Sequence, residues 1–497
     1  MTAQCIRCVR PVLRSAPAIE RVGRRVFPGL AGVTVAEARG DPSATEVGAV
    51  VYDSRRAVHG ALFCCIPGAR SDGHAFAAAA VAQGAGSLLC ERFLDLAVPQ
   101  VRVAPGAVRP AMAEVASTFW GHPDRSLTTV GVTGTNGKTT VTHLVRAILE
   151  AAGRPTGVIG TLSGVRTTPE APDLQEALAG LVAEGRSAVA LEVSSHALSQ
   201  HRVEGMTFDV AAFTNLSRDH LDHHGTMEEY FAAKCRLFEP ERARRAVVLV
   251  GTPWGDRLAG MVGDRLVAVR RGDATEVQPT VSGTSFRWRG RPVALPLAGA
   301  FNVDNALVAA AVADCLGIDP DTVVAGLAGA PPVPGRMEVV GADLPVSVVV
   351  DYAHTPEGLE VALEACRRLV GPGRVLCVFG CGGDRDPGKR PLMGAVAARL
   401  ADVVVVTSDN PRSEDPAAIA AAVVAGIDGT PDGGPQVVLD RAEAIASAVA
   451  QARPGDLVLV AGKGHETSQT TGAGSVPFDD RQVATDALAD RFGEAAR

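Results

Sequence analysis

The chain has 497 residues, of which 46% are hydrophobic and 4% aromatic, so its interior must consist mostly of Ala, Val and Leu. A chain of this length exceeds one hydrophobic core, and about two to four domains are expected. The formal net charge of −7 argues against a nucleic-acid-binding protein. Because no apolar run reaches the roughly 18 residues that cross a bilayer, we expect no membrane insertion.

Cysteine usage indicates a reduced compartment. Most of the 10 cysteines lie in apolar runs, where cysteine behaves as a small hydrophobic residue. Cys5 and Cys8 form the one C-x-x-C pair, and no second pair completes a zinc site. Residues 1–25 are rich in Arg, as in transit peptides, but we interpret them as a flexible extension of an Arg-rich chain. We therefore expect a cytoplasmic protein. We also expect it to act as a monomer.

Two domains of an α/β fold are predicted in the first two thirds of the chain. Short strands and an Ala-rich helix between residues 47 and 120 indicate a small N-terminal domain, 1–125. A strand, a polar turn and a helix at 127–153 then begin a β–α alternation, which predicts a central parallel-sheet domain, 126–336. Within it we expect strands at 188–195, 209–217 and 245–250, a β-ribbon at 284–297 and a buried helix at 302–317.

A third domain is predicted over residues 337–497. Its five short hydrophobic strands are mostly separated by Ala-rich helices, a pattern typical of a doubly wound, Rossmann-like parallel sheet. Functional residues in such sheets lie at the carboxyl ends of the strands, where polar motifs stand in this sequence. The strands are expected at 346–354, 374–383, 402–410, 435–440 and 456–464.

The turn "GTNGKTT" resembles a shortened phosphate loop. It follows a strand and opens a helix, the context in which backbone amides and a helix N-terminus bind phosphates. Lys138 would then reach the β- and γ-phosphates of ATP, and Thr139 would hold Mg²⁺. The alternative is a plain Gly–Asn turn before a helix. The candidate ATP-binding residues of the loop are Gly134, Thr135, Asn136, Gly137, Lys138, Thr139 and Thr140.

Lysine is rare in this chain, which holds only Lys138, Lys234, Lys389 and Lys463 among 48 basic residues. These positions are candidates for tasks that a guanidinium cannot perform. Lys234 lies in a predicted helix, downstream of the polar run "TNLSRDHLDHHG" and of Glu192. Because Mg²⁺ prefers oxygen ligands, a neutral amine that captures CO₂ as a carbamate would supply one. A solvated surface charge is the alternative.

Several motifs together resemble the Mur ligases, and among these the type that adds the third residue of the peptidoglycan stem peptide. The resemblance runs in order from about residue 50 to 490, and it rests on "TGTNGKTT", "EVSSHALSQHRV", "FTNLSRDHLDHHGTMEEYFAAKCRLF", "VVVDYAHTPEGL", "GCGGDRDPGKRPLM", "SDNPRSEDP" and "AGKGHE". It implies a uridine-nucleotide-binding first domain, an ATPase second domain and an amino-acid-binding third domain.

The resemblance also implies roles for individual residues. Catalytic residues would be Lys138, Glu192, His220 and Lys234, the lysine at 234 being the family's carbamylated position, and Mg²⁺ ligands would be Thr139, Glu192, His220 and Lys234. Asn305 would contact adenine, with Arg336 and Asp351 on the phosphates and ribose. The UDP-substrate would be bound by Ser54, Ala69, Arg70, Ser71, Thr167, Thr168, Ser194, Gln200 and Arg202.

"SDNPR" indicates which amino acid is added. A guanidinium fork grips a carboxylate at two points, and meso-diaminopimelate carries a second carboxylate where lysine has only an ammonium. In the family this motif marks the diaminopimelate-adding enzymes. We therefore expect ATP-dependent joining of meso-diaminopimelate to UDP-N-acetylmuramoyl-L-alanyl-D-glutamate through an acyl phosphate. The pocket would comprise Arg385, Asp409, Asn410, Pro411, Arg412, Gly462 and Glu466.

Three alternatives stay open at this point. The segment 160–168 is short, and Arg166 stands where the family has a polar amide, which is compatible with a ligase recruited to join another amino acid. A folylpolyglutamate-type ligase shares the central domain but should lack "DSR" and "DNPR". A non-catalytic scaffold should have lost Lys138, Glu192 or Lys234. Lys389 and His354 have either a structural or a functional role.

Overall fold

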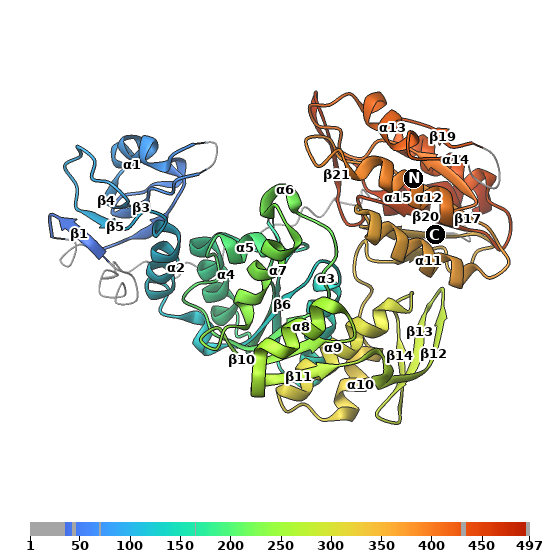
Figure 1. Cartoon of the computed structure of the whole chain (residues 1–497), viewed down its shortest axis with the longest axis horizontal. Coiled ribbons are helices and arrows are strands. Elements are labelled where there is room, and N and C mark those ends of the chain that lie inside the picture. The colour runs from blue at the N-terminus through green and yellow to red at the C-terminus, as the bar shows by residue number, and fades with distance from the viewer. Residues whose placement is uncertain (1–34, 42–45, 69–70, 165, 429–433, 494–497) are drawn as a thin grey trace, which may run out of the picture. The chain divides into compact units, whose positions relative to one another are not determined.

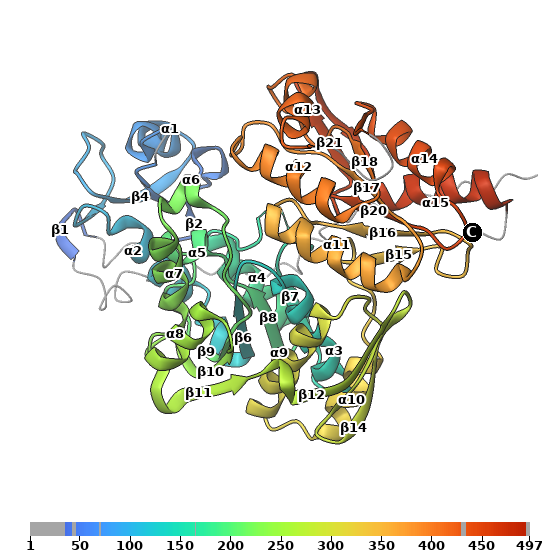
Figure 2. The same cartoon turned by 45° about the vertical axis from the view of Figure 1, so that its right-hand side comes forward.

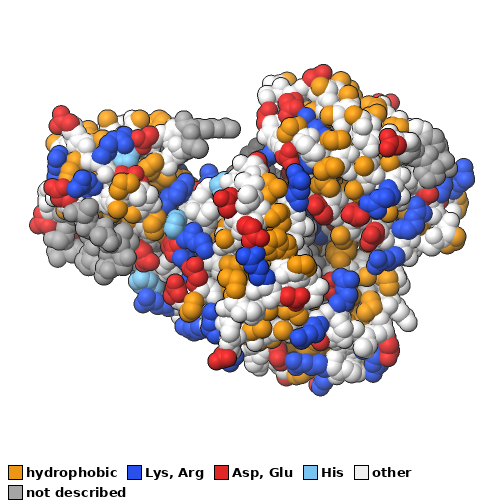
Figure 3. All heavy atoms as spheres, viewed as in Figure 1, with side chains coloured by type: hydrophobic (Ala, Val, Ile, Leu, Met, Phe, Trp, Pro, Cys, Tyr) orange, Lys and Arg blue, Asp and Glu red, His pale blue; other side chains and the backbone are white. Residues whose placement is uncertain are grey.

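The structure is a computed structural model that describes residues 35–41, 46–68, 71–164, 166–428 and 434–493 (Figure 1). The chain divides into two compact units, one of residues 1–128, 168–189 and 197–206, and the other of residues 129–167, 190–196 and 207–497. No helix among the described residues is long and apolar enough to span a membrane. On the face drawn in Figure 3, Lys and Arg side chains are interspersed with Asp and Glu, so no patch of one sign covers it.

The first unit is built on a five-stranded sheet in the order β1-β5-β4-β3-β2. The β2–β3, β3–β4 and β4–β5 pairs are parallel and β1 pairs with β5 antiparallel, so one edge strand runs against the rest. Buried side chains of β5 and α2 share one core cluster with Ala171 of α4. The elements are β1 Val35–Arg39, β2 Ala49–Val51, η3 Ser54–Arg56, β3 Ala61–Cys64, η4 Gly73–Phe76, α1 Ala77–Ala82, β4 Ala85–Cys90, β5 Gln100–Val103, α2 Val108–Phe119, η5 Pro123–Ser126 and α4 Ala171–Ala183.

The second unit begins with a six-stranded sheet in the order β11-β10-β9-β6-β8-β7. Its β6–β9, β9–β10 and β10–β11 pairs are parallel, as the β–α alternation predicts. The elements are β6 Thr128–Thr133, α3 Lys138–Ala151, β7 Thr156–Ile159, β8 Ala188–Glu192, α5 Ser195–Ser199, β9 Phe208–Phe213, α6 Leu221–His224, α7 Met227–Cys235, η6 Arg236–Phe238, β10 Ala243–Leu249, α8 Pro253–Val262, η7 Gly263–Arg265, β11 Leu266–Val269 and η8 Arg271–Asp273.

The predicted β-ribbon and buried helix follow this sheet. Strands β12 Ala274–Thr280, β13 Gly283–Trp288 and β14 Arg291–Leu295 form an antiparallel sheet, which confirms the ribbon. Arg289 and Gly290 join β13 to β14 with φ of 49° and 77°, the left-handed pair that a tight hairpin turn requires. Helix α9 Phe301–Cys315 is buried along most of its length, and α10 Pro320–Ala328 follows it.

The carboxyl-terminal sheet has the order β15-β16-β20-β17-β18-β19, and all its pairs are parallel except β15–β16. The elements are β15 Glu338–Val340, β16 Ser347–Asp351, α11 Pro356–Val370, β17 Val375–Phe379, α12 Lys389–Leu400, β18 Val403–Val406, α13 Pro416–Val424, β19 Gln436–Val437, α14 Arg441–Gln451, β20 Leu457–Ala461, β21 Ser468–Thr471, β22 Gly474–Pro477 and α15 Asp480–Phe492.

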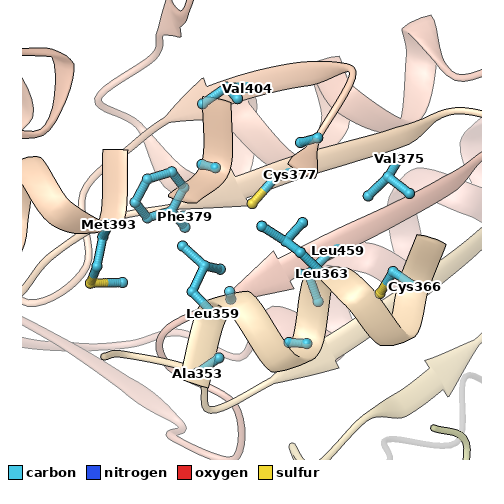
Figure 4. Close-up of a cluster of buried hydrophobic side chains, with 14 of the residues drawn as sticks. Ala353, Leu359, Leu363, Cys366, Val375, Cys377, Phe379, Met393, Val404 and Leu459 are labelled. Carbon is cyan, nitrogen blue, oxygen red and sulfur yellow. The ribbon is translucent and has the colours of Figure 1, made fainter. Parts of the chain in front are cut away.

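Both faces of this sheet are buried, which explains why its strands are continuous hydrophobic runs. Cys377 and Phe379 of β17 join a core cluster with Leu363 of α11 (Figure 4), whereas Leu376 and Val378 join another with α14 and α15. Figure 2 shows α11 and α12 along one side of β16, β20 and β17. The doubly wound fold class is therefore confirmed, while the boundaries predicted at residues 125 and 336 stay predictions.

The core on the α11 side generates a stability prediction. Leu363 is fully buried there, so Leu363→Ala should lower the free energy of unfolding by about 2–5 kcal/mol, measured by urea denaturation. Val361 lies on the same helix with 42% of its surface exposed, and Val361→Ala should change stability by less than about 0.5 kcal/mol. Equal losses in the two variants would contradict this assignment of the helix faces.

Candidate functional site

The phosphate-loop candidate lies between β6 and α3. Gly134 and Gly137 have φ of 148° and 84°, which favour glycine. A Cβ at Gly137 would lie 2.4 Å from Asn305 Oδ1, and one at Gly134 would lie 1.9 Å from Thr214 Oγ1. In the described structure no side chain caps the N-terminus of α3, so its first N–H groups remain available to an anion.

A carboxylate lies beside the first turn of α3. Thr139 Oγ1 donates to Glu192 Oε2 at 3.0 Å, and Glu192 comes from the end of β8. Thr161 fixes the carboxylate from the other side, because its N–H donates to Oε1 at 2.8 Å and its hydroxyl to Oε2 at 3.1 Å. A hydroxyl and a carboxylate at a phosphate loop are oxygen ligands of the kind that Mg²⁺ binds.

Lys234 is buried against the phosphate loop. Only 1% of its surface is exposed, and its Nζ donates to Gly134 O at 2.8 Å. Lys138 Nζ donates to the same oxygen at 3.0 Å and to Thr135 O at 2.8 Å. Burial lowers the pKa of Lys234 well below its ordinary value, and the charge of Lys138 lowers it further. The interpretation of Lys234 as a solvated surface charge is therefore wrong.

Helix α7 carries Lys234 into this position. Thr226 caps the helix by accepting from Glu229 N at 3.2 Å. Tyr230 lies one turn before Lys234, whose Nζ is 4.5 Å from the ring centroid, and the Tyr230 hydroxyl is 3.1 Å from Thr135 Oγ1. The helix thus meets the loop through two side chains. Sequence reasoning missed Tyr230, although its spacing of four residues from Lys234 was a usable signal.

His220 lies at the start of α6 with a φ of 54°, rare for a residue with a side chain. Burial lowers its pKa to about 4, against the opposing charge of Asp219, so its imidazole is neutral near pH 7 and can bind a metal. Its ring centroid is 4.8 Å from that of His196, which the sequence analysis did not select, and 6.0 Å from that of Tyr230. Among the described residues, no three His, Cys, Asp or Glu side chains are arranged to hold a metal. The predicted magnesium ligands differ from such a cluster, because they include the hydroxyl of Thr139 and the modified amine of Lys234.

Arg336 reaches the phosphate loop from the far end of the predicted central domain. Its Nη2 donates to Thr139 Oγ1 at 3.2 Å, and its guanidinium lies 4.6 Å from the Tyr352 ring centroid. Asp351 accepts from Met337 N and Ala353 N at 2.8 and 2.9 Å, which fixes the backbone beside Arg336. Burial raises the pKa of Asp351.

Asn305, the candidate adenine contact, and the two residues of open role, Lys389 and His354, all form hydrogen bonds within the protein. Asn305 Nδ2 donates to Asn302 Oδ1 at 2.9 Å, and its carboxamide oxygen lies against Gly137. Lys389 Nζ donates to His354 O at 2.8 Å, and His354 Nδ1 is 2.8 Å from Tyr352 O. Burial lowers the pKa of His354. These bonds favour structural roles for Lys389 and His354.

The uridine-nucleotide candidates fall into separate groups. Arg202 brings three together, since it donates to Thr168 O at 2.8 Å and to Gln200 Oε1 at 2.7 Å, and pairs with Glu170 at 3.0 Å. Ser54 begins η3 and Ser71 O accepts from Gly68 N at 3.0 Å, both in the first unit. Thr167 and Ser194 belong to the second unit. Ala69 and Arg70 lie outside the described residues.

The amino-acid candidates gather at the carboxyl ends of β18 and β20. Asn410 Nδ2 donates to Glu466 Oε2 at 2.7 Å, and a Cβ at Gly462 would lie 2.6 Å from Asp409 Oδ2. Lys463, which is fully buried, uses all three of its donors here, on Asn410 Oδ1 at 3.1 Å, Glu466 Oε2 at 2.9 Å and Ser468 O at 2.7 Å.

Two arginines flank Gly382 beside this cluster. A Cβ there would lie 3.0 Å from Arg412 Nη1 and 3.8 Å from Arg385 Cγ. Arg412 has a φ of 52°, and its Nη1 donates to Gly383 O at 2.6 Å. Pro411 adjoins the same loop, because its carbonyl oxygen would lie 2.0 Å from a Cβ at Gly383. The structure thus brings the predicted pocket residues to neighbouring loops.

A buried ion pair that the sequence analysis missed supports these loops. Arg441 and Asp480 are both fully buried at 2.7 Å. The same guanidinium donates to Ser408 O at 3.2 Å and to Ala461 O at 3.0 Å, at the bases of the two loops. Among 44 arginines nothing in the local sequence distinguishes Arg441, because its partner lies 39 residues away.

Comparison with known protein families matches three domain models to the chain. The Mur ligase family catalytic domain matches residues 46–119, the Mur ligase middle domain residues 132–313, and the Mur ligase glutamate ligase domain residues 335–464. The chain is a Mur ligase. Among its curated relatives are UDP-N-acetylmuramoyl-L-alanyl-D-glutamate–2,6-diaminopimelate ligases from Synechococcus elongatus, 48% identical over 88% of this chain and 93% of the relative, and from Syntrophomonas wolfei, 43% identical over 91% and 96%.

Solved structures with a similar fold include other ligases. A UDP-N-acetylmuramoyl-L-alanyl-D-glutamate–2,6-diaminopimelate ligase superposes with a TM-score of 0.66 and 33% identity, covering 95% of this chain and 99% of the other. A folylpolyglutamate synthase from Mycobacterium tuberculosis superposes with a TM-score of 0.58, 20% identity and 78% coverage of this chain, against 95% of its own. At that identity the likeness to the synthase shows the fold alone.

The buried Lys463 generates a prediction that depends on pH. Burial alone raises the pKa of Glu466, but the Lys463 ammonium and the Asn410 amide outweigh it and hold that pKa below its ordinary 4.5. The pair therefore stabilises the fold fully above that value and loses its contribution as pH falls through the folded pKa. Lys463→Met should lower the free energy of unfolding by about 3–5 kcal/mol at pH 7, because it leaves a carboxylate unpaired.

The loss in Lys463→Met should shrink as pH falls from 4.5 through the depressed pKa of Glu466 in the folded wild type, because the pair then loses its charge. Lys389→Met is the matched control, because Lys389 donates to a carbonyl and not to a carboxylate. Its loss at pH 7 should be smaller than that of Lys463→Met. Urea denaturation between pH 3.5 and 7 measures both variants. A pH-independent loss in Lys463→Met would contradict the pairing with Glu466.

Proposed function

We propose that this Mur ligase joins meso-diaminopimelate to UDP-N-acetylmuramoyl-L-alanyl-D-glutamate at the expense of ATP. The observation that carries the proposal is the pair of arginines, Arg385 and Arg412, beside the Asn410–Glu466 contact. The relatives described above are named for the same reaction with 2,6-diaminopimelate. Both the nucleotide specificity and the meso configuration are part of the proposal.

ATP would bind at the loop between β6 and α3. Backbone N–H groups at the start of α3 and the cations of Lys138 and Arg336 would stabilise the phosphates. To reach them, Lys138 exchanges its bonds to Gly134 O and Thr135 O for phosphate oxygens. Positioning and charge stabilisation are the main contributions that a protein makes to phosphoryl transfer.

Magnesium is the metal that this oxygen-rich site would hold, with Thr139, Glu192, His220 and a carbamate on Lys234 as the protein ligands. Bound there, Mg²⁺ supplies positive charge to the β- and γ-phosphates. The contact of Thr139 with Glu192 at 3.0 Å supports this set. The residues' own task is to keep that carboxylate aligned, which Thr161 does by two hydrogen bonds.

Lys234 fits the carbamate chemically. Its depressed pKa favours the neutral amine, and a neutral amine attacks CO₂ and releases one proton to form the anionic carbamate. Arginine is too basic to do the same. A carbamate on Lys234 would also place an anion near the Lys138 ammonium, since both side chains reach Gly134 O.

The γ-phosphoryl group would move to the side-chain carboxylate of D-glutamate. The resulting acyl phosphate is attacked by the free amine of the amino acid, the tetrahedral intermediate collapses, and phosphate leaves. No protein nucleophile is needed, so the chain contributes alignment of the two substrates. Arg412 and Arg385 would hold the distal carboxylate of diaminopimelate, whereas the distal ammonium of L-lysine would be repelled.

The amino-acid specificity is tested with a panel of acceptors at fixed ATP and UDP-muramoyl-dipeptide. Phosphate release should require the nucleotide and meso-diaminopimelate together, and L-lysine should be turned over at least about 10²-fold less efficiently, because its ammonium faces two guanidinium groups. Equal kcat/KM with L-lysine would contradict the specificity. Turnover with a different amino acid alone would identify a recruited ligase instead.

The modified lysine is tested by chemical rescue. Lys234→Ala should lower kcat by about 10²-fold or more, since it removes a charged ligand from the site. Added acetate or formate should restore part of the activity, because a short carboxylate replaces the carbamate oxygens. Lys138→Ala is the matched control and should show no rescue, because it lacks a cation and not an anion. Full activity of Lys234→Ala without added carboxylate would contradict the carbamate.

A further inference from the structure

Resting on the proposed function, we propose that a polar clamp outside the predicted pocket sets the preference for an amino acid with a distal carboxylate. The loop clamp consists of Asp384, Arg390, Ser413 and Glu414. It joins the loop after β17 to the loop after β18, which carry Arg385 and Arg412 respectively. Glu414 is its central member and acts as a positioning residue for the Arg412 guanidinium.

The loop clamp joins the two loops through side chains at consecutive positions of the second loop, Ser413 and Glu414. Ser413 Oγ donates to Asp384 Oδ1 at 2.6 Å, and Asp384 N donates to Glu414 Oε1 at 2.6 Å. Arg390 Nη2 donates to both carboxylate oxygens of Glu414 at 2.9 Å. One carboxylate therefore holds a backbone amide of the first loop and a guanidinium of α12 at the same time.

The two arginine-bearing loops are also joined by their backbones, next to the clamp. Gly383 N donates to Asn410 O at 2.9 Å, and Gly383 O accepts from Arg412 Nη1 at 2.6 Å. The guanidinium that would grip a substrate carboxylate is thus already oriented by one of its five donors. Its other donors keep their directions only while the two loops keep their spacing.

Both loops adopt left-handed backbone beside the clamp. Asp384 and Arg412 have φ of 54° and 52°, a region that residues with side chains adopt only where the surroundings hold them there. Asp384 belongs to the clamp, and Arg412 directly precedes Ser413. Arg412 N also donates to Thr470 O at 3.1 Å, so that bond and the clamp together hold this turn. Without the clamp we expect the Arg412 side chain to leave its position beside Gly382.

The charge of Glu414 is essential to the clamp. Arg390 has only 7% of its side chain exposed, and Glu414 is the one carboxylate that pairs with it in the described part of the chain. Glu414 itself is 35% exposed, so it contacts solvent as well as the guanidinium. An amide at position 414 would keep the shape but leave the buried guanidinium without an anion.

The other half of the predicted pocket is held independently. Asn410 and Glu466 are fixed by Lys463, and that lysine has no bond to the clamp. The phosphate loop has its own contacts with Glu192 and Lys234. Loss of the clamp should therefore affect the distal carboxylate of the amino acid and leave ATP and nucleotide binding unchanged.

The test measures steady-state kinetics of the full-length Glu414→Gln variant with each substrate varied in turn. We expect the KM for meso-diaminopimelate to rise about 10-fold or more, with kcat and the KM values for ATP and the nucleotide within about twofold of the wild type. The preference over L-lysine should fall by a similar factor. Glu414→Asp, which keeps the charge, should recover part of the lost affinity.

Glu360→Gln is the matched control, because Glu360 also pairs with an arginine, Arg399 at 2.6 Å, but on α11 away from the two loops. It should leave every KM unchanged. A lower melting temperature in Glu414→Gln with unchanged KM and unchanged discrimination would overturn the proposal, since the clamp would then be structural only. If the wild type prefers another amino acid, the proposed function fails. The clamp is then tested with that amino acid as the acceptor, and an unchanged KM for it in Glu414→Gln would overturn the clamp.

Discussion

Two amines share one carbonyl oxygen at the centre of this Mur ligase. Lys138 and Lys234 both donate to Gly134 O in a site from which water is largely excluded. Burial lowers the pKa of both amines, and the charge of Lys138 lowers that of Lys234 further, whereas the Glu192 carboxylate opposes the shift at Lys138. The depressed pKa of Lys234, on which the proposed carbamate depends, thus follows from the close approach of α7 to the phosphate loop.

The carboxyl-terminal sheet positions loops that leave separate strands. Its strands are buried on both faces, so the strand ends are fixed by packing and cannot adjust to the ligand. The loops that leave β17, β18 and β20 then need only short-range contacts to meet. Arg441, Lys463 and Glu414 supply these contacts, each by bridging chain segments that are distant in sequence.

The helices, the strands and the motif residues could be predicted from the sequence, because local patterns encode them. The hydrophobic runs predict β16 to β20, and the glycine turn before Lys138 predicts the phosphate loop. Rarity of lysine identified Lys234 as unusual, but its burial appeared only with the tertiary structure. Asp480, His196 and Glu414 were missed for the same reason, since their meaning depends on partners that no local pattern reveals.

The pair formed by Arg441 and Asp480 limits how this Mur ligase can diverge. Each side chain is fully enclosed, so replacing either one alone strands a charge in the interior. Evolutionary routes away from the pair must pass through that disfavoured state or change both codons together. A homologue without the arginine is therefore expected to lack the aspartate as well, and to fasten the two strand ends by apolar packing.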